Sequence, residues 1–113
     1  MDADRARQLL AQERERIERA IAGLETAESE AAAEQSEPGE GGSEDLYQKE
    51  LDTGLGEDLA DQLAAVDRAE ARLEAGTYGL SVESGEPIPD ARLEVIPTAE
   101  RTAEEQALFE RGL

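Results

Sequence analysis

Two long stretches of this chain carry apolar residues at helical spacing, and the segment between them cannot continue a helix. In the first stretch, apolar residues recur at intervals of seven, with others on adjacent turns: Ala3, Leu10, Ile17, Leu24 and Ala31, with Ala6, Ala20, Ile21 and Ala27. In the second, they fall three or four apart: Leu55, Leu59, Leu63, Val66, Ala69 and Leu73. Each spacing predicts a long helix with one apolar face.

The segment between the stretches, residues 36–43, reads SEPGEGGS. One Pro and three Gly remove its helical preference, so the first helix must end before it. Two amphipathic helices joined by so short a breaker are expected to fold back antiparallel. Gly76 directly follows the second stretch and is a candidate C-cap. The sequence therefore predicts a mostly α protein, with a long antiparallel two-helix coiled-coil hairpin over residues 1–75 and a tip at about 36–44.

Residues 76–113 differ from the rest and are expected to form a small separate module. Their Gly and Pro content and β-favouring pieces such as LEVI predict turns with a small hairpin. Thr102 followed by Glu105 is a capping-box pattern and predicts a short C-terminal helix. Eight apolar residues are candidates for a minicore: Leu80, Val82, Ile88, Leu93, Val95, Ile96, Leu108 and Phe109.

Charge limits the possible partners. Twenty-nine acidic residues against eleven basic ones leave a net charge of −18, which disfavours direct DNA binding and favours a monomer. Residues 25–62 hold thirteen acidic residues against Lys49 as their one basic residue. This acidity fits either a partner with a basic surface or cavity, or an ordinary solvated surface.

Several classes of function are disfavoured by what the chain lacks. It contains no Cys and no His, so it offers no thiolate site and no evident pairing of nucleophile and base, and an enzyme is not expected. No cofactor is expected either. The start, MDADRARQLL, has no hydrophobic leader, and no apolar run is long enough to span a bilayer. A cytoplasmic protein is the expectation.

The module's sequence resembles the zinc finger of the TraR/DksA family. In that family a G-x-Y/F-G step leads into C-x-x-C-G, an I-x-x-x-R-L element, a Pro and a second C-x-x-C. Eight positions match in order and spacing: Gly76, Tyr78, Gly79, Gly85, Ile88, Arg92, Leu93 and Pro97. The four cysteine positions hold Ser81, Ser84, Thr102 and Glu105, with 17 residues between the two pairs.

The resemblance implies a zinc-ribbon-like module, but two Ser, one Thr and one Glu cannot supply the thiolate or imidazole tetrahedron of a structural zinc. We therefore expect a metal-free, degenerate finger. Ser81 and Ser84 are expected to bond neighbouring backbone, and Thr102 to cap the last helix. Arg92 is expected to tie the module to the hairpin through a salt bridge.

The resemblance also implies a function. Members of the family regulate transcription by inserting the hairpin tip into the secondary channel of RNA polymerase, where acidic tip residues act. The corresponding carboxylates here are Glu37, Glu40, Glu44 and Asp45, whereas Ser36 and Gly41 stand where aspartates are common in the family. The alternative is a diverged, metal-independent stress or protein-interaction module that keeps the scaffold without regulating polymerase.

Overall fold

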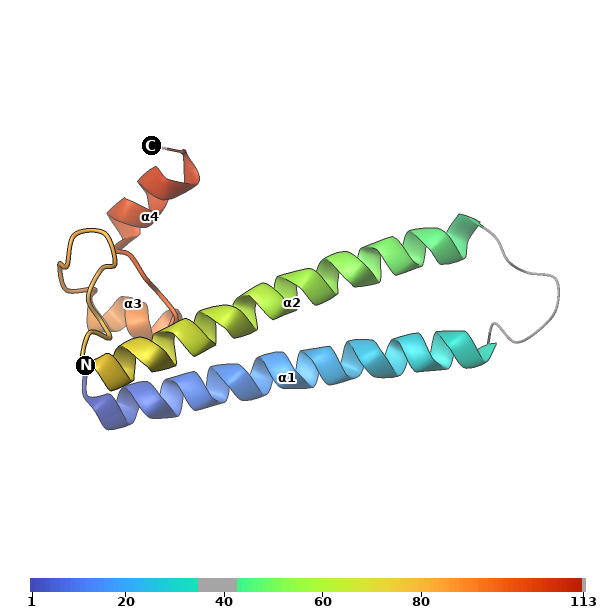
Figure 1. Cartoon of the computed structure of the whole chain (residues 1–113), viewed down its shortest axis with the longest axis horizontal. Helices are drawn as coiled ribbons and strands as arrows, with labels where there is room; N and C mark the ends of the chain where they lie inside the picture. Colours follow the sequence, from blue (N-terminus) through green and yellow to red (C-terminus); the bar gives the residue numbers. More distant parts are fainter. Residues whose placement is uncertain (35–42, 113) are drawn as a thin grey trace. The chain divides into compact units, whose positions relative to one another are not determined.

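The computed structural model describes the backbone of residues 1–34 and 43–112 and the side chains of residues 1–26 and 54–112. Four helices follow one another in this part of the chain: α1 (Ala3–Glu34), α2 (Ser43–Ala75), α3 (Asp90–Val95) and α4 (Ala103–Glu110) (Figure 1). The described residues contain no strand, and their β pairing is a single antiparallel bridge between Leu80 and Pro87. The predicted mostly helical fold is confirmed, as are two long helices on either side of residues 36–42.

The chain divides into two compact units, of which the first combines Met1–Arg14 with Ala64–Leu113 and the second is Glu15–Leu63. In the second unit, Arg16 of α1 donates to the side chain of Gln62 of α2 at 2.9 Å. Ile17 is fully buried, and Glu15 forms an ion pair at 2.6 Å with Arg19, one turn further along α1.

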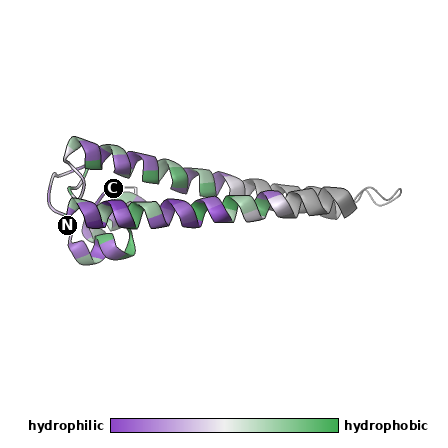
Figure 2. Ribbon diagram, turned by 90° about the horizontal axis from the view of Figure 1, so that it is seen from below, coloured by the Kyte–Doolittle hydropathy of each residue, from purple (hydrophilic) through white to green (hydrophobic). Residues whose placement is uncertain are grey.

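In the first unit, the start of α1 packs on the end of α2 through small and aliphatic side chains: Ala6, Leu9, Leu10, Val66 and Ala69. Most of these lie on the predicted apolar faces, and Figure 2 shows hydrophilic and hydrophobic residues alternating along the coloured parts of both helices. Polar contacts flank this core, since Arg14 pairs with both Asp67 and Glu70. These pairs raise the pKa of Arg14, chiefly through its hydrogen bond to Asp67. Among the described residues, no helix is long and apolar enough to cross a membrane.

The end of α2 is fixed by Gly76, as predicted. Its φ of 79° lies in the left-handed region, which L side chains rarely adopt. The amide of Thr77 donates to the carbonyl of Arg72 at 2.9 Å, and that of Gly76 to Leu73 at 3.2 Å. This pair of bonds is a Schellman motif, which satisfies the last carbonyls of the helix and turns the chain away from it.

After α2 the chain forms a tight turn and a small core. The amide of Ser81 donates to Glu86 O at 2.8 Å and the amide of Ile88 to Gly79 O at 2.7 Å, so residues 79–81 run beside 86–88. The core of this region consists of Ile88, Leu93 and Ala99, with Tyr78 packed against it. The small hairpin predicted here is present as this short pairing.

Two predictions for this region are wrong. The LEVI piece is not extended, because Asp90–Val95 is α3: the amides of Arg92 and Leu93 bond to Pro89 O, and Pro89 opens the helix with a φ of −57°. The minicore is also smaller than predicted. Only Ile88 and Leu93 of the eight candidates are buried, and Val95 is 80% exposed because a six-residue helix turns a single face inward.

Candidate functional site

The acidic tip lies mostly outside the described residues. Glu37 and Glu40 fall between the described ranges. Glu44 and Asp45 are placed in the first turn of α2, but their side chains are outside the described part. The predicted role of these four carboxylates therefore stays a prediction.

The four positions that hold cysteine in the TraR/DksA zinc finger come together in the module. Ser81 is 5% exposed and lies in the turn before α3. Its Oγ accepts the backbone amides of Glu83 at 3.1 Å and Ser84 at 3.3 Å, as expected for a serine that organises a turn. The Oγ of Ser84 accepts the amide of Glu86 at 3.2 Å in the same way.

Thr102 and Glu105 form the predicted capping box of α4. The amide of Glu105 donates to Thr102 Oγ1 at 3.2 Å, and the amide of Thr102 donates to Glu105 Oε1 at 3.0 Å. The hydrogen bond from the Thr102 amide, followed by the influence of the Ser81 and Ser84 hydroxyls, lowers the pKa of Glu105 to about 2. The spacing of Thr102 and Glu105 predicted the cap, but it gave no sign of the link to the serines.

These four side chains do not fit a structural zinc ion. Such an ion takes Cys thiolate and His nitrogen ligands in nearly every structural site. Here three of the four groups are neutral hydroxyls, and the oxygens of Ser81 and Thr102 already accept backbone amides. Across the described residues, no group of three or more His, Cys, Asp and Glu side chains is placed to hold a metal. Hydrogen bonds hold these side chains in place.

The other positions that resemble the family have structural contacts. The hydroxyl of Tyr78 donates to Pro97 O at 2.8 Å, and burial raises the pKa of this phenol. Gly85, with a φ of 74°, allows the turn in which its amide bonds to Ser81 O at 3.0 Å. Arg92 does not form the predicted salt bridge: its Nε donates to Arg101 O at 3.0 Å, and it forms no ion pair with any described residue.

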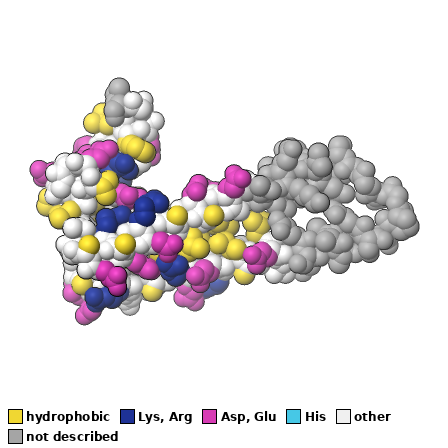
Figure 3. All heavy atoms as spheres, viewed as in Figure 1, with side chains coloured by type: hydrophobic (Ala, Val, Ile, Leu, Met, Phe, Trp, Pro, Cys, Tyr) yellow, Lys and Arg dark blue, Asp and Glu magenta, His cyan; other side chains and the backbone are white. Residues whose placement is uncertain are grey.

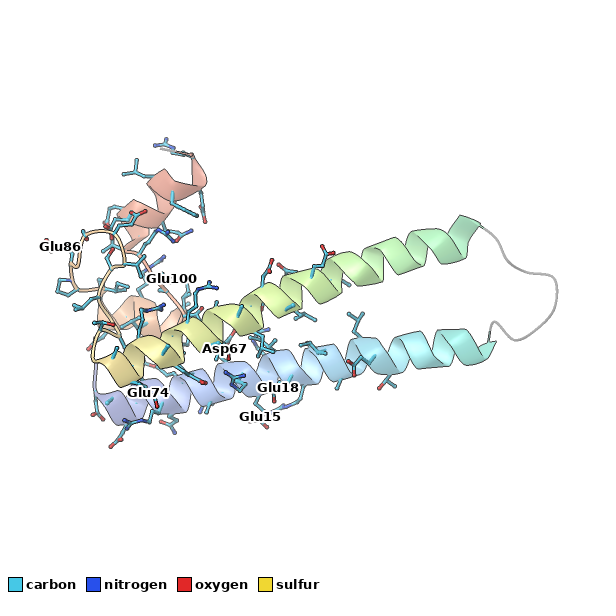
Figure 4. All side chains as sticks on the ribbon, viewed as in Figure 1. Glu15, Glu18, Asp67, Glu74, Glu86 and Glu100 are labelled. Carbon is cyan, nitrogen blue, oxygen red and sulfur yellow. The ribbon has the colours of Figure 1, made fainter. Side chains whose placement is uncertain are left out.

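Other residues tie the module to the helices within the first unit. Arg5 of α1 binds Glu94 of α3 through two hydrogen bonds of 3.0 and 2.7 Å. Hydrogen bonding to Arg5 is the main reason that the pKa of Glu94 is lowered. Glu100, labelled in Figure 4, contacts Arg68 at 2.9 Å and Arg72 at 3.6 Å, both on α2. The sequence did not predict these links, because the partners lie 89 and 32 residues apart and no local sequence pattern indicates such pairs.

An open groove of about 670 Å³ lies on the first unit, between α2, the segment after α3, and α4. Its apolar lining includes Ile96 and Phe109, which is 52% exposed, against the prediction that it belongs to the core. Arg101 lies over the ring of Phe109, 3.8 Å from its centroid, and Arg68 and Arg92 line the same groove. Apolar and basic side chains are visible together on this part of the surface (Figure 3).

Comparison with known proteins matches this module to a family. The model described as "Prokaryotic dksA/traR C4-type zinc finger" covers residues 76–111. The RNA polymerase-binding transcription factor DksA of Caulobacter vibrioides is 47% identical over 49 residues, which is 43% of this chain and 34% of that protein. The uncharacterized protein YteA of Bacillus subtilis is 37% identical over 75 residues, or 66% of this chain and 31% of that one.

General stress protein 16O of Bacillus subtilis is 40% identical over 65 residues, which is 58% of this chain and 36% of that protein. The chain thus spans about a third of the length of the curated relatives that it matches. Among solved structures, the transcription factor DksA2 of Pseudomonas aeruginosa superposes with a TM-score of 0.80 at 29% identity. That superposition covers 96% of this chain and 83% of DksA2, and it includes the helical hairpin. Residues 76–111 thus belong to the dksA/traR zinc-finger family, and the chain shares the fold of DksA2.

Proposed function

We propose that this protein is a transcription regulator that binds RNA polymerase through the secondary channel, with the acidic hairpin tip as the inserted element. The observation that carries the proposal is the likeness to DksA2 over 96% of the chain, which includes the hairpin as well as the finger. The name of the Caulobacter relative, an RNA polymerase-binding factor, supports the choice of partner.

In this proposal, the chain has two parts: the hairpin of residues 1–75 reaches into the channel, and residues 76–113 dock on its rim. The acidity of residues 25–62 suits a channel whose walls attract anions. The groove with Ile96, Phe109 and Arg101 offers the mixture of aromatic, aliphatic and Arg side chains that is common at the centres of protein interfaces. The net charge of −18 supports a monomer that makes no direct contact with DNA.

The test is the affinity of the full chain for purified RNA polymerase core enzyme, measured by biolayer interferometry at low salt. The tip variant carries Glu37→Gln, Glu40→Gln, Glu44→Gln and Asp45→Asn. If tip carboxylates drive insertion, this variant should bind at least about tenfold more weakly, because it loses four charges that steer and hold the tip.

A matched variant removes the same number of charges elsewhere: Asp2→Asn, Glu74→Gln, Glu86→Gln and Glu104→Gln. All four residues are exposed, and none of them forms an ion pair with another residue in the described part of the chain. This variant should retain most of the affinity. Equal losses in the two variants would mean that net charge alone, and not the tip, determines binding.

The second candidate function is a metal-independent stress or protein-interaction module that does not regulate polymerase. The specific observation in its favour is the 40% identity to general stress protein 16O over 65 residues. Failure of the unmodified chain to bind polymerase even at low salt would remove the first proposal and leave this one. Neither function requires an enzyme or a cofactor, and both place the protein in the cytoplasm.

A further inference from the structure

We infer that Arg101 is an ionic cross-link that joins the two halves of the finger to each other and to α4. The first half is the turn of residues 81–84, and the second is residues 100–105. In a four-cysteine finger, a zinc ion holds the halves together by binding two ligands from each. In this chain an arginine and a carboxylate from the two halves bind each other directly.

The two halves run side by side at the cross-link. The amide of Val82 donates to Glu100 O at 2.8 Å. The next residue of each half forms an ion pair, in which Arg101 Nε donates to Glu83 Oε1 at 3.0 Å. Glu83 stands between the two cysteine positions of its half, and Arg101 directly precedes the first cysteine position of the other. The pair therefore spans the halves beside the positions at which a zinc finger would bind its metal.

Arg101 has contacts on two further sides. Its guanidinium carbon lies 3.8 Å from the centroid of the Phe109 ring, on α4. Its backbone carbonyl accepts from Arg92 Nε, on α3, at 3.0 Å. Its side chain is 18% exposed, whereas that of Glu83 is 45% exposed. Arginine suits this place because its planar group can donate to a carboxylate and face an aromatic ring at the same time.

An ionic cross-link makes the finger sensitive to salt. The attraction between two partly exposed charges is screened as the ionic strength rises. The joint between residues 81–84 and residues 100–105 should therefore loosen in high salt, and α4 should lose part of its attachment. The finger thus contains a conformational device whose closed form is favoured at low ionic strength.

The first test replaces Arg101→Gln in the full chain. The readout is hydrogen exchange of the Val82 amide, whose bond to Glu100 O crosses between the halves. We expect its protection to fall by about tenfold, because an ion pair and a cation–π contact, each worth a few-fold, are lost together.

The matched control is Arg111→Gln, which removes the same charge from an exposed residue at the C-cap of α4. This control should leave the protection of Val82 unchanged. Equal effects of Arg101→Gln and Arg111→Gln, or no effect of the first, would overturn the inference.

The second test changes the other partner, Glu83→Gln, which leaves the contact of Arg101 with Phe109 in place. Protection of Val82 should fall by about three- to fivefold, as for one partly exposed ion pair. Glu86→Gln, an exposed carboxylate two residues beyond the turn, should have no effect.

The variant that combines Glu83→Gln with Arg101→Gln should lose no more protection than Arg101→Gln alone. Fully additive losses would show that the two residues act independently, and the inference would be wrong. If Arg101→Gln does not fold, the comparison of Glu83→Gln with Glu86→Gln decides by itself.

The third test varies sodium chloride from about 0.01 M to about 1 M. The difference in Val82 protection between the unmodified chain and Glu83→Gln should be largest at the low concentration and should nearly vanish at the high one. A difference that does not change with salt would mean that the contact is not ionic and would overturn the inference.

Discussion

Glu105 illustrates what can and cannot be read from the sequence at the scale of single residues. Its role in the cap follows from its spacing to Thr102, because a capping box is a local pattern. The influence of Ser81 and Ser84 on its pKa depends on the fold that brings the start of α4 to a turn some twenty residues earlier in the chain. The serines themselves behave as predicted and bond to neighbouring backbone.

The lowered pKa of Glu105 predicts a pH dependence. Its folded-state pKa is about 2, below the ordinary value of 4.5, so folding favours the ionised form. The resulting stabilisation is fully present above about pH 4.5 and is lost as the pH falls toward 2. Thermal unfolding of the unmodified chain and of Glu105→Gln should therefore differ most at pH 7.

The gap between the two melting temperatures should narrow progressively between about pH 5 and pH 2, since Gln does not titrate. Other carboxylates are common to both proteins, so their titration cancels in the difference. A gap that stays constant over this range would show that the charge of Glu105 does not contribute to stability.

At the scale of elements, long patterns were predicted well and short ones poorly. The apolar faces of α1 and α2 and the end of α2 follow from periodicity and one glycine. The segment of α3 is helical although its β-branched residues predict an extended chain. In so short a segment their preference is outweighed by Pro89, which begins the helix. The minicore was overestimated for a related reason: two short helices bury few side chains, and Phe109 pairs with Arg101 at the surface.

Gly54 within α2 and Gly76 directly after it should respond to alanine in opposite directions. Gly76→Ala should lower the free energy of unfolding by about 1 kcal/mol, because alanine is strained at a φ of 79° even though the space around it is open. Gly54→Ala lies within the helix, with nothing within 4 Å of the added Cβ, and should raise it by roughly 0.5–1 kcal/mol. Urea unfolding followed by circular dichroism measures both. Effects of the same sign would contradict the assignment of Gly76 as the cap.

At the scale of the whole molecule, the excess of negative charge dominates. The chain has a net charge of −18, and the described cations are largely engaged in pairs such as Arg5 with Glu94 and Arg68 with Glu100. Exposed pairs of this kind contribute little to stability, because solvent screens them. The sequence gives the total charge but not these pairings, since most of them join residues far apart in the chain.

Added salt should therefore stabilise the protein. Self-repulsion between the excess carboxylates is screened as the Debye length falls from about 30 Å at 0.01 M to about 3 Å at 1 M salt. We expect the melting temperature to rise when sodium chloride is increased over this range. A fall would show that the ion pairs, which salt also weakens, outweigh the repulsion.

The hydroxyl-for-thiol exchange at the centre of the finger also has a consequence for redox chemistry. A zinc–thiolate centre is open to oxidants, because thiolates are converted by peroxide to sulfenic acid or disulfide and then no longer hold the metal. This chain has no cysteine, and its single sulfur atom belongs to Met1. Its finger is built from alcohols, an amide and a carboxylate, none of which mild oxidants attack, so its fold is indifferent to the redox state around it.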